Sequence, residues 1–328
     1  RIRLQRELTR IGSTQKFMFP VGKIEQLPIY PLSFDEFLLN SNEKLFNVTK
    51  KAYESRTPLS SSIHELVLNE FYKYLLIGGM PEAVNTYFES NSFLESRRVL
   101  KDLYDNYLSD MELYQASRES CLRSKNLFSN IYGQLNKESK NFSPGFIEEK
   151  TKTRDYFHPI QWLTLAHIVN QSFQLKQHVT MPLIPDGEGK FRLFLGDIGM
   201  FSYQSGINAS SFVAPNKENT LSGIFYENYV ANELVAKGIG LYYWRGKNDA
   251  ELEFIIESDN KLYPLDVKNV YGVLISLVIF SIHYSFDMAI NVSKNNYGYD
   301  HEKKLVTIPF YFMPFLAEDL KNGTFKVD

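Results

Sequence analysis

The sequence predicts a multidomain α+β chain in which a helical segment and a winged-helix-like unit precede an α/β domain. Three stretches carry this prediction. Apolar residues recur at three- and four-residue spacing through 65–114, which is typical of helices. Three helical patterns and then two strand patterns follow within 122–196. Helix and strand patterns alternate through 216–328, as in an α/β unit.

The composition is that of a folded protein from a reducing compartment. Of the 328 residues, 44% are hydrophobic and 15% aromatic, which is enough apolar side chain to build packed cores. Cys121 is the single cysteine, so a disulfide framework is excluded. The most apolar stretch, 270–282, contains polar residues and is too short to span a bilayer. We therefore expect a cytoplasmic protein with no membrane partner.

Helix boundaries can be predicted in the first half of the chain. A helix should begin at Phe34, because Ser33 is a suitable N-cap and Glu36 occupies the capping-box position. The segment GGMPEAV at 78–84 interrupts the helical pattern. Its glycine pair should end one helix, and Pro81 should stand in the first turn of the next.

The middle of the chain has the layout of a winged helix. Helices are predicted around 127–135, from Ser143 and from Pro159. Two strands near 175–184 and 190–196 flank the turn Pro-Asp-Gly-Glu-Gly. Three helices followed by a hairpin is the order of elements in winged-helix proteins.

Basic residues of this middle unit are candidates for contacting nucleic-acid phosphates. They are Lys137, Lys140, Lys150, Lys152 and Arg154. Phosphate contacts by such residues make affinity fall steeply with salt. Two alternatives stay open, a solvated charged face and a surface that packs against protein.

The last part of the chain contains the residues with chemical potential. A helix at 222–237 leads to strands at 241–245, 251–256 and 262–268. Side chains alternate along a strand, so Asp266 and Lys268 should share a face of the third. Pairing of the last two strands across a turn near Asp259 and Asn260 would bring Glu253 close to Asp266, and Glu227 on the helix could add a third carboxylate.

Clustered carboxylates attract hard divalent cations. Glu253 and Asp266 are the predicted ligands of Mg²⁺ or Mn²⁺, and a metal-bound water is a nucleophile at neutral pH. Lys268 could stabilise charge on a phosphoryl group, and Glu227 could act as a further ligand or position the water. These residues predict metal-dependent hydrolysis of phosphodiesters. The alternative is an ordinary exposed hairpin of mixed charge.

The chain resembles a prokaryotic family of AAA+-superfamily ATPases whose C-terminal domain, of unknown function, is related to PD-(D/E)XK nucleases. The matching segments occur in order: FPVGKIEQLPIYPLSFDEFL at 19–38, YLLIGGMPEAV at 74–84, QLNKESKNFSPGFI at 134–147, WLTLAHIV at 162–169, FRLFLGDIGMF at 191–201, GIFYENYVANEL at 223–234, YYWRGKNDAELEFII at 242–256 and YPLDVK at 263–268. The resemblance implies four parts: the end of an AAA+ ATPase domain at 1–40, the helical segment at 41–120, the winged-helix-like unit at 121–215 and a PD-(D/E)XK-like domain at 216–328.

The resemblance also sets expectations about activity. No Gly-Lys pair has P-loop spacing, so ATPase activity is not expected here. ATP would bind in a domain before Arg1, and the chain would be the C-terminal portion of a longer protein. In the family, Asp is usual where Glu253 stands, and Glu where Asp266 stands, so a metal would sit differently. The implied function is a nucleic-acid-associated protein with a metal-dependent DNA endonuclease domain. The alternative is an inactive nuclease-like fold that serves as a regulatory or protein-interaction module.

Overall fold

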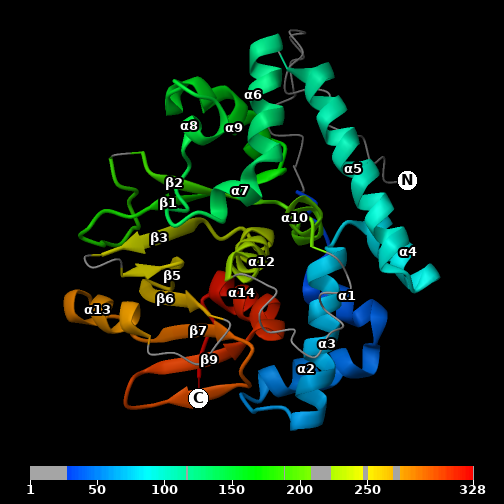
Figure 1. Cartoon of the computed structure of the whole chain (residues 1–328). Helices are drawn as coiled ribbons and strands as arrows, with labels where there is room; N and C mark the ends of the chain where they lie inside the picture. The colour runs from blue at the N-terminus through cyan, green and yellow to red at the C-terminus, as the bar shows by residue number, and fades with distance from the viewer. Residues whose placement is uncertain are drawn as a thin grey trace, which may run out of the picture.

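The computed structural model shows a mixed α+β chain, as the sequence predicts (Figure 1). The basic stretch at 1–24, and most of the 1–40 segment, lie outside the described residues. None of the described helices combines the length and the apolar character needed to cross a bilayer. The structure describes residues 28–115, 117–187, 189–207, 223–246, 250–268 and 274–327.

The helical segment begins and turns where the sequence predicts. Ser33 precedes α1, and its backbone N–H donates to the Glu36 carboxylate at 2.9 Å. Gly78, with φ of 75°, ends α3, and Pro81 opens α4. The helices of this segment are α1 (Phe34–Ser41), α2 (Glu43–Glu54), α3 (Ser61–Ile77), α4 (Pro81–Ser90) and α5 (Phe93–Tyr114).

The middle region contains the predicted helices, but its first strand lies earlier than predicted. Strand β1 is Val169–Gln174 and not 175–184. Within 175–184 only Leu175 forms a bridge, with Pro185, and Pro182 has no N–H to give to a sheet. The other elements are α6 (Arg118–Ser129), α7 (Ile131–Leu135), α8 (Pro144–Ile147), η2 (Thr153–Tyr156), α9 (Phe157–Leu165), β2 (Phe191–Leu195) and α10 (Ile198–Ser205).

The hairpin of β1 and β2 is not a free-standing wing. Strand β1 pairs antiparallel with β2 on one edge and parallel with β3 (Leu241–Arg245) on the other. Together with β4 (Glu251–Leu252) they form one sheet in the order β2-β1-β3-β4. This sheet therefore crosses the boundary that we predicted between residues 215 and 216.

A second sheet has the order β5-β6-β7-β9-β8. Its three central strands, β6, β7 and β9, are parallel to one another, and β5 and β8 pair antiparallel at the two edges. The remaining elements of this region are α12 (Gly223–Ala236), β5 (Phe254–Ser258), β6 (Lys261–Val267), α13 (Ile275–His283), β7 (Ala289–Ser293), β8 (Gly298–Asp300), β9 (Leu305–Pro309), η4 (Phe310–Phe312) and α14 (Met313–Asn322).

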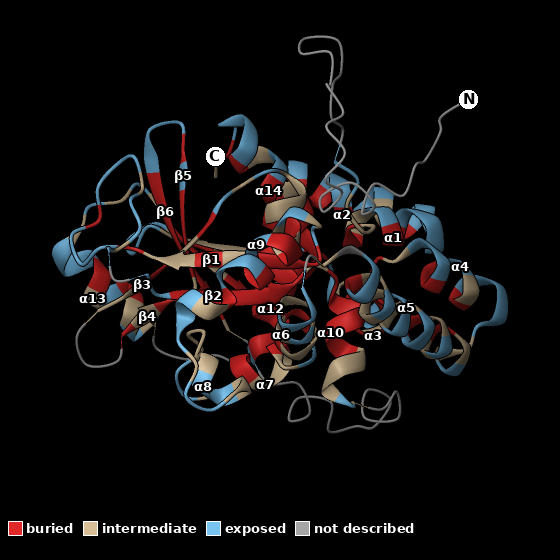
Figure 2. Ribbon diagram, turned by 90° about the horizontal axis from the view of Figure 1, so that it is seen from above, coloured by how far each residue is buried: buried red, intermediate tan, exposed pale blue. Residues whose placement is uncertain are grey.

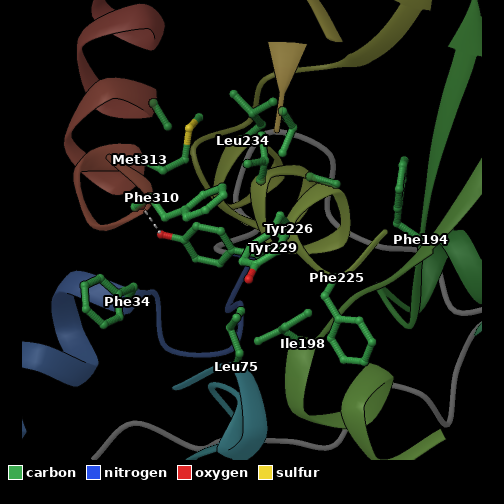
Figure 3. Close-up of a cluster of buried hydrophobic side chains, with 14 of the residues drawn as sticks. Phe34, Leu75, Phe194, Ile198, Phe225, Tyr226, Tyr229, Leu234, Phe310 and Met313 are labelled. Carbon is green, nitrogen blue, oxygen red and sulfur yellow. Dashed lines mark hydrogen bonds between the residues drawn. The ribbon is translucent and has the colours of Figure 1, made fainter. Parts of the chain in front are cut away.

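Helix α12 is the centre of the molecule (Figures 1 and 2). Most of its residues are buried, which is typical of a helix that packs on all sides. The Tyr226 ring stacks on the Phe310 ring with 4.4 Å between the ring centres. The Tyr229 hydroxyl donates a hydrogen bond to the Phe310 carbonyl at 3.0 Å (Figure 3). Such packing fixes the position of every side chain that α12 carries, Glu227 included.

Glycines allow α3, α10 and the segment before α1 to meet at van der Waals distance. A Cβ atom on Gly79 would lie 2.0 Å from the Leu32 carbonyl oxygen, and one on Gly199 would lie 2.3 Å from the Ile77 carbonyl oxygen. The buried Asp197 carboxylate accepts from the backbone N–H groups of Gly79 at 2.7 Å and Met200 at 2.8 Å. Burial raises the pKa of Asp197 to about 6, although these hydrogen bonds favour its charged form.

We predict that Gly79→Ala destabilises the fold by about 3 kcal/mol or more, because the new methyl group overlaps backbone that cannot move freely. Gly145→Ala is the matched control, since nothing lies within 4 Å of its added Cβ. Urea unfolding followed by circular dichroism measures both. Equal midpoints for the two variants would contradict this account of the glycine contact.

Candidate functional site

The candidate site lies where the chain passes from β4 in the first sheet to β5 in the second. We predicted a continuous strand at 251–256, but Glu253 stands between β4 and β5 and belongs to neither. The turn that joins β5 to β6 is where we expected it, with Asp259 and Asn260 both in the left-handed region. Phe254 pairs with Leu265, so Glu253 is placed one residue further along, next to Asp266.

Asp266 and Lys268 form a pair at the end of β6. Asp266 is fully buried, and Lys268 Nζ lies 2.9 Å from its Oδ2 atom. The Lys268 side chain is one-third exposed, so its amino group reaches Asp266 from the surface. Apart from this ion pair, neither carboxylate oxygen of Asp266 has a hydrogen-bond partner among the described residues. The Lys268 amino group is therefore the main group there that stabilises the buried Asp266 carboxylate.

The surroundings of Glu253 favour the neutral form of its carboxyl group. Burial raises the pKa of its carboxyl well above the usual value, and the charges of Asp266 and Glu227 raise it further. The charge of Lys140 and a hydrogen bond from the Val267 backbone N–H, at 3.1 Å, only partly oppose this shift.

Lys140 pairs with the buried Glu227. It belongs to loop 136–143, between α7 and α8, and its Nζ atom lies 2.6 Å from Oε1 of Glu227 and 3.4 Å from Oε1 of Glu251. Burial would lower the pKa of Lys140, but the charges of Glu227, Glu253 and Glu251 raise it overall, so the amino group stays charged. The second oxygen of Glu227 is buried without a hydrogen-bond partner among the described residues.

Arg192 on β2 supplies a second internal cation. Its side chain is 2% exposed, its Nη2 atom lies 2.5 Å from Oε2 of Glu251, and its guanidinium lies 4.0 Å from the centre of the Tyr243 ring. Burial alone would raise the pKa of Glu251, but Arg192 and then Lys140 lower it overall. Glu251 is thus held as an anion between two cations from the middle region.

The four carboxyl groups of Glu227, Glu251, Glu253 and Asp266 are called the acid cluster below. Three cations face it, and burial favours the neutral form of one carboxyl group, that of Glu253. Much of the negative charge of the cluster is therefore compensated by cations of the protein itself. The three cations that face the acid cluster are Lys140, Arg192 and Lys268.

The sequence predicted part of this arrangement. Glu227, Glu253, Asp266 and Lys268 do come together, because Glu253 experiences the charges of Glu227 and Asp266 while Lys268 pairs with Asp266. Two of these carboxyl groups are enclosed by the protein. Asp266 is fully buried and Glu227 is 3% exposed. The catalytic roles assigned to these residues stay predictions.

The sequence analysis missed three members of the site. Lys140 was predicted to contact nucleic acid, but its amino group points inward and pairs with Glu227. Glu251 was not singled out. Arg192 could have been found, because a charge within the apolar strand FRLFL is costly unless it is paired.

The other predicted nucleic-acid contacts lie closer to solvent. Lys150, Lys152 and Arg154 are exposed, and the Lys137 amino group lies 3.5 Å from the centre of the Phe146 ring. The Oδ1 atom of Asp155 lies 3.8 Å from Nε of Arg154, and its negative charge reduces the net positive charge of this surface. The basic surface is therefore smaller than the sequence predicted.

The acid cluster does not fit a divalent cation in this conformation. Within the ranges that the structure describes, no group of three or more His, Cys, Asp or Glu side chains is arranged to hold a metal ion. Lys140 stands between Glu227 and Glu251, where its positive charge takes the place that a cation would need. The unpartnered oxygens of Glu227 and Asp266 are suitable ligand atoms by their chemistry alone.

Two families of unknown function match the chain. The first, Domain of unknown function (DUF8612), matches residues 68–211. The second, Domain of unknown function (DUF4143), matches residues 222–311. Neither a curated protein nor a solved structure matches in the corresponding comparisons.

The ionic contacts of the site connect the two matched regions. Lys140 and Arg192 lie in the first match, whereas the whole acid cluster and Lys268 lie in the second. Charge on one region is therefore compensated by charge on the other, across an interface that also includes the shared sheet of β1 and β3.

We predict that Glu251→Gln destabilises the chain by about 2 kcal/mol. The change leaves Arg192 buried without its counter-ion, and the cost is reduced because Glu251 is itself a fifth exposed. Adding Arg192→Leu should recover part of this loss, which a double-mutant cycle on urea unfolding measures. Glu149→Gln on the exposed surface is the control. Additive effects of the two substitutions would contradict the pairing.

Proposed function

We propose that the C-terminal domain is a nuclease-like domain that does not cut nucleic acid in this conformation. It acts as a regulatory or protein-interaction module of a nucleic-acid-associated protein. The observation that carries this proposal is the contact of Lys140 with Glu227 at 2.6 Å. It places a positive charge from the middle region inside the acid cluster.

Metal-dependent hydrolysis needs conditions that this cluster does not offer. The carboxylates must be free to bind a cation, which lowers the pKa of a bound water, and the phosphodiester must reach that water. Here Lys140 and Arg192 already compensate Glu227 and Glu251, and burial raises the pKa of Glu253, which favours its neutral form. Asp266 is fully buried. The charge that a metal would neutralise is thus neutralised already.

The resemblance to ATPase-family proteins supports the regulatory interpretation. The ordered sequence segments resemble AAA+-superfamily ATPases with a nuclease-related C-terminal domain, and the P-loop expected of such proteins is not in this chain. In this proposal ATP binds in a separate domain, and the present region responds to that domain or selects its target.

We predict that the wild-type chain shows no saturable Mn²⁺ binding in calorimetry and no Mn²⁺-dependent nicking of supercoiled plasmid. The reason is the internal compensation of the acid cluster by Lys140, Arg192 and Lys268. Nicking that is lost in both Lys268→Ala and Asp266→Asn would contradict the proposal. Nicking that persists unchanged in both variants would come from a contaminating nuclease.

A second candidate function, binding of single-stranded nucleic acid, is favoured by exposed aromatic rings beside the basic residues. Phe146 is 43% exposed and Phe157 is 62% exposed. They stand close in sequence to the exposed Lys150, Lys152 and Arg154. Bases stack on such rings while basic side chains contact the phosphates, which is how many proteins bind single strands.

We predict that replacing Lys150, Lys152 and Arg154 together by Glu weakens binding of a labelled oligothymidine. The magnitude of the slope of log affinity against log salt concentration should decrease by ~2, because each of the three lost phosphate contacts contributes ~0.7 to it. Fluorescence anisotropy over a salt series measures the slope. The matched control replaces the exposed Lys44, Lys50 and Lys51 of α2 by Glu. Equal slopes in the two triple variants would rule out this surface.

A further inference from the structure

Two adjoining pockets lie away from the acid cluster, against the segment 29–33 that precedes α1. The smaller has a volume of about 20 Å³ and the larger a volume of about 210 Å³. The smaller holds one group of the size of a water molecule, and the larger exceeds an engineered cavity of ~150 Å³ that binds benzene. The lining residues common to both pockets are Tyr30, Pro31, His167, Gly196 and Asp197.

The smaller pocket is lined by a buried carboxyl group that lacks a donor. Glu233 of α12 belongs to this lining and is 1% exposed. Its Oε1 atom accepts from the Phe34 backbone N–H at 3.0 Å, whereas Oε2 has no hydrogen-bond partner within the described part of the chain. A buried polar atom without a partner is costly, so a ligand that donates to Oε2 gains affinity by satisfying it.

The charges around Glu233 favour a cationic ligand. Burial raises the pKa of Glu233 well above its usual value, and the charges of Asp35 and Glu36 raise it further. The Phe34 hydrogen bond and the charge of Lys237 oppose this shift. The Lys237 amino group is itself shared with Glu318, whose Oε2 atom lies 3.0 Å from its Nζ atom. A positive charge beside Glu233 would therefore be attracted by several carboxylates at once.

The larger pocket suits an apolar body of the size of an aromatic ring. Burying apolar ligand surface there removes it from water, at roughly 25 cal/mol for each Å². Tyr107, His167 and Asp197 are the polar side chains of the lining. Its apolar walls come from Met80, Pro81, Phe128, Ile168, Leu195 and Met200.

We propose that the two pockets form one binding site for a small amine with a ring-sized apolar body. The ammonium group donates to Oε2 of Glu233, and the apolar body fills the larger pocket. The site shares no residue with the acid cluster, so it adds a ligand to the function proposed above and does not depend on that function. Asp197 lies in the first matched region and Glu233 in the second, so the bound amine contacts both.

The test is calorimetry on the full chain with benzylamine as the probe and benzyl alcohol as its uncharged analogue. Benzylamine should bind at least roughly tenfold more tightly, because its donor is charged. Titrations in buffers of different ionisation enthalpy should show proton release, because a bound cation lowers the pKa of Glu233. The affinity should therefore rise with pH while the amine stays charged. The titratable groups that face Glu233 are Asp35 and Glu36 of α1, Tyr74 of α3, and Tyr229 and Lys237 of α12.

Two substitutions test the two halves of the site separately. Glu233→Gln keeps an acceptor for the Phe34 N–H, and it should lower the affinity for benzylamine to that for benzyl alcohol and abolish proton release. Ala166→Leu adds apolar bulk to the lining of the larger pocket and should weaken the binding of both probes. Glu149→Gln on the exposed surface is the control and should change neither affinity.

Several outcomes overturn the inference. Equal affinities for the two probes, or no measurable binding of benzylamine, show that Glu233 does not select a cation. Full benzylamine affinity in Ala166→Leu shows that the ligand does not extend into the larger pocket. If Glu233→Gln does not fold, the comparison of the two probes and the Ala166→Leu result still decide, because neither uses that variant.

Discussion

The ion pair between Lys140 and Glu227 is the constraint on which the rest of the site depends. Glu227 is carried by α12, which is packed on nearly every side and cannot turn its carboxylate toward water. A buried charge of this kind requires a partner. The partner comes from a loop 87 residues earlier in the chain, so folding of the middle region and charge balance in the C-terminal domain are coupled.

The arrangement of the two sheets explains why the compensation is internal. Strand β3 joins the hairpin of β1 and β2, which brings Arg192 on β2 within reach of Glu251 on β4. The chain then bends at Glu253 and enters the second sheet, where β5 pairs with β6 and places Asp266 nearby. The acid cluster thus lies at the junction of the sheets, and the first sheet supplies one of its cations directly.

The sequence predicted the parts of this site that depend on local periodicity. Alternation along β6 and the turn at Asp259 and Asn260 were enough to place Glu253 beside Asp266. The counter-ions could not be predicted in the same way. Lys140 is flanked by polar residues in the sequence, and only the tertiary fold turns it toward Glu227.

The fold itself was predicted best where capping and turn residues mark boundaries. Ser33, Gly78 and Pro81 each stand at the helix end that their chemistry favours. Strand β1 was misplaced because apolar residues continue after Gln174. Its true position is decided by pairing with β2 and β3, and such nonlocal pairing leaves no short-range signal.

An experimental crystal structure of the wild-type chain soaked in MnCl₂, with anomalous diffraction data, tests the central claim most directly. The account predicts the Lys140 amino group within ion-pair distance of Glu227 and no anomalous peak in the acid cluster. A Mn²⁺ peak bound by Glu227 or Asp266, with Lys140 turned away at full occupancy, would contradict it.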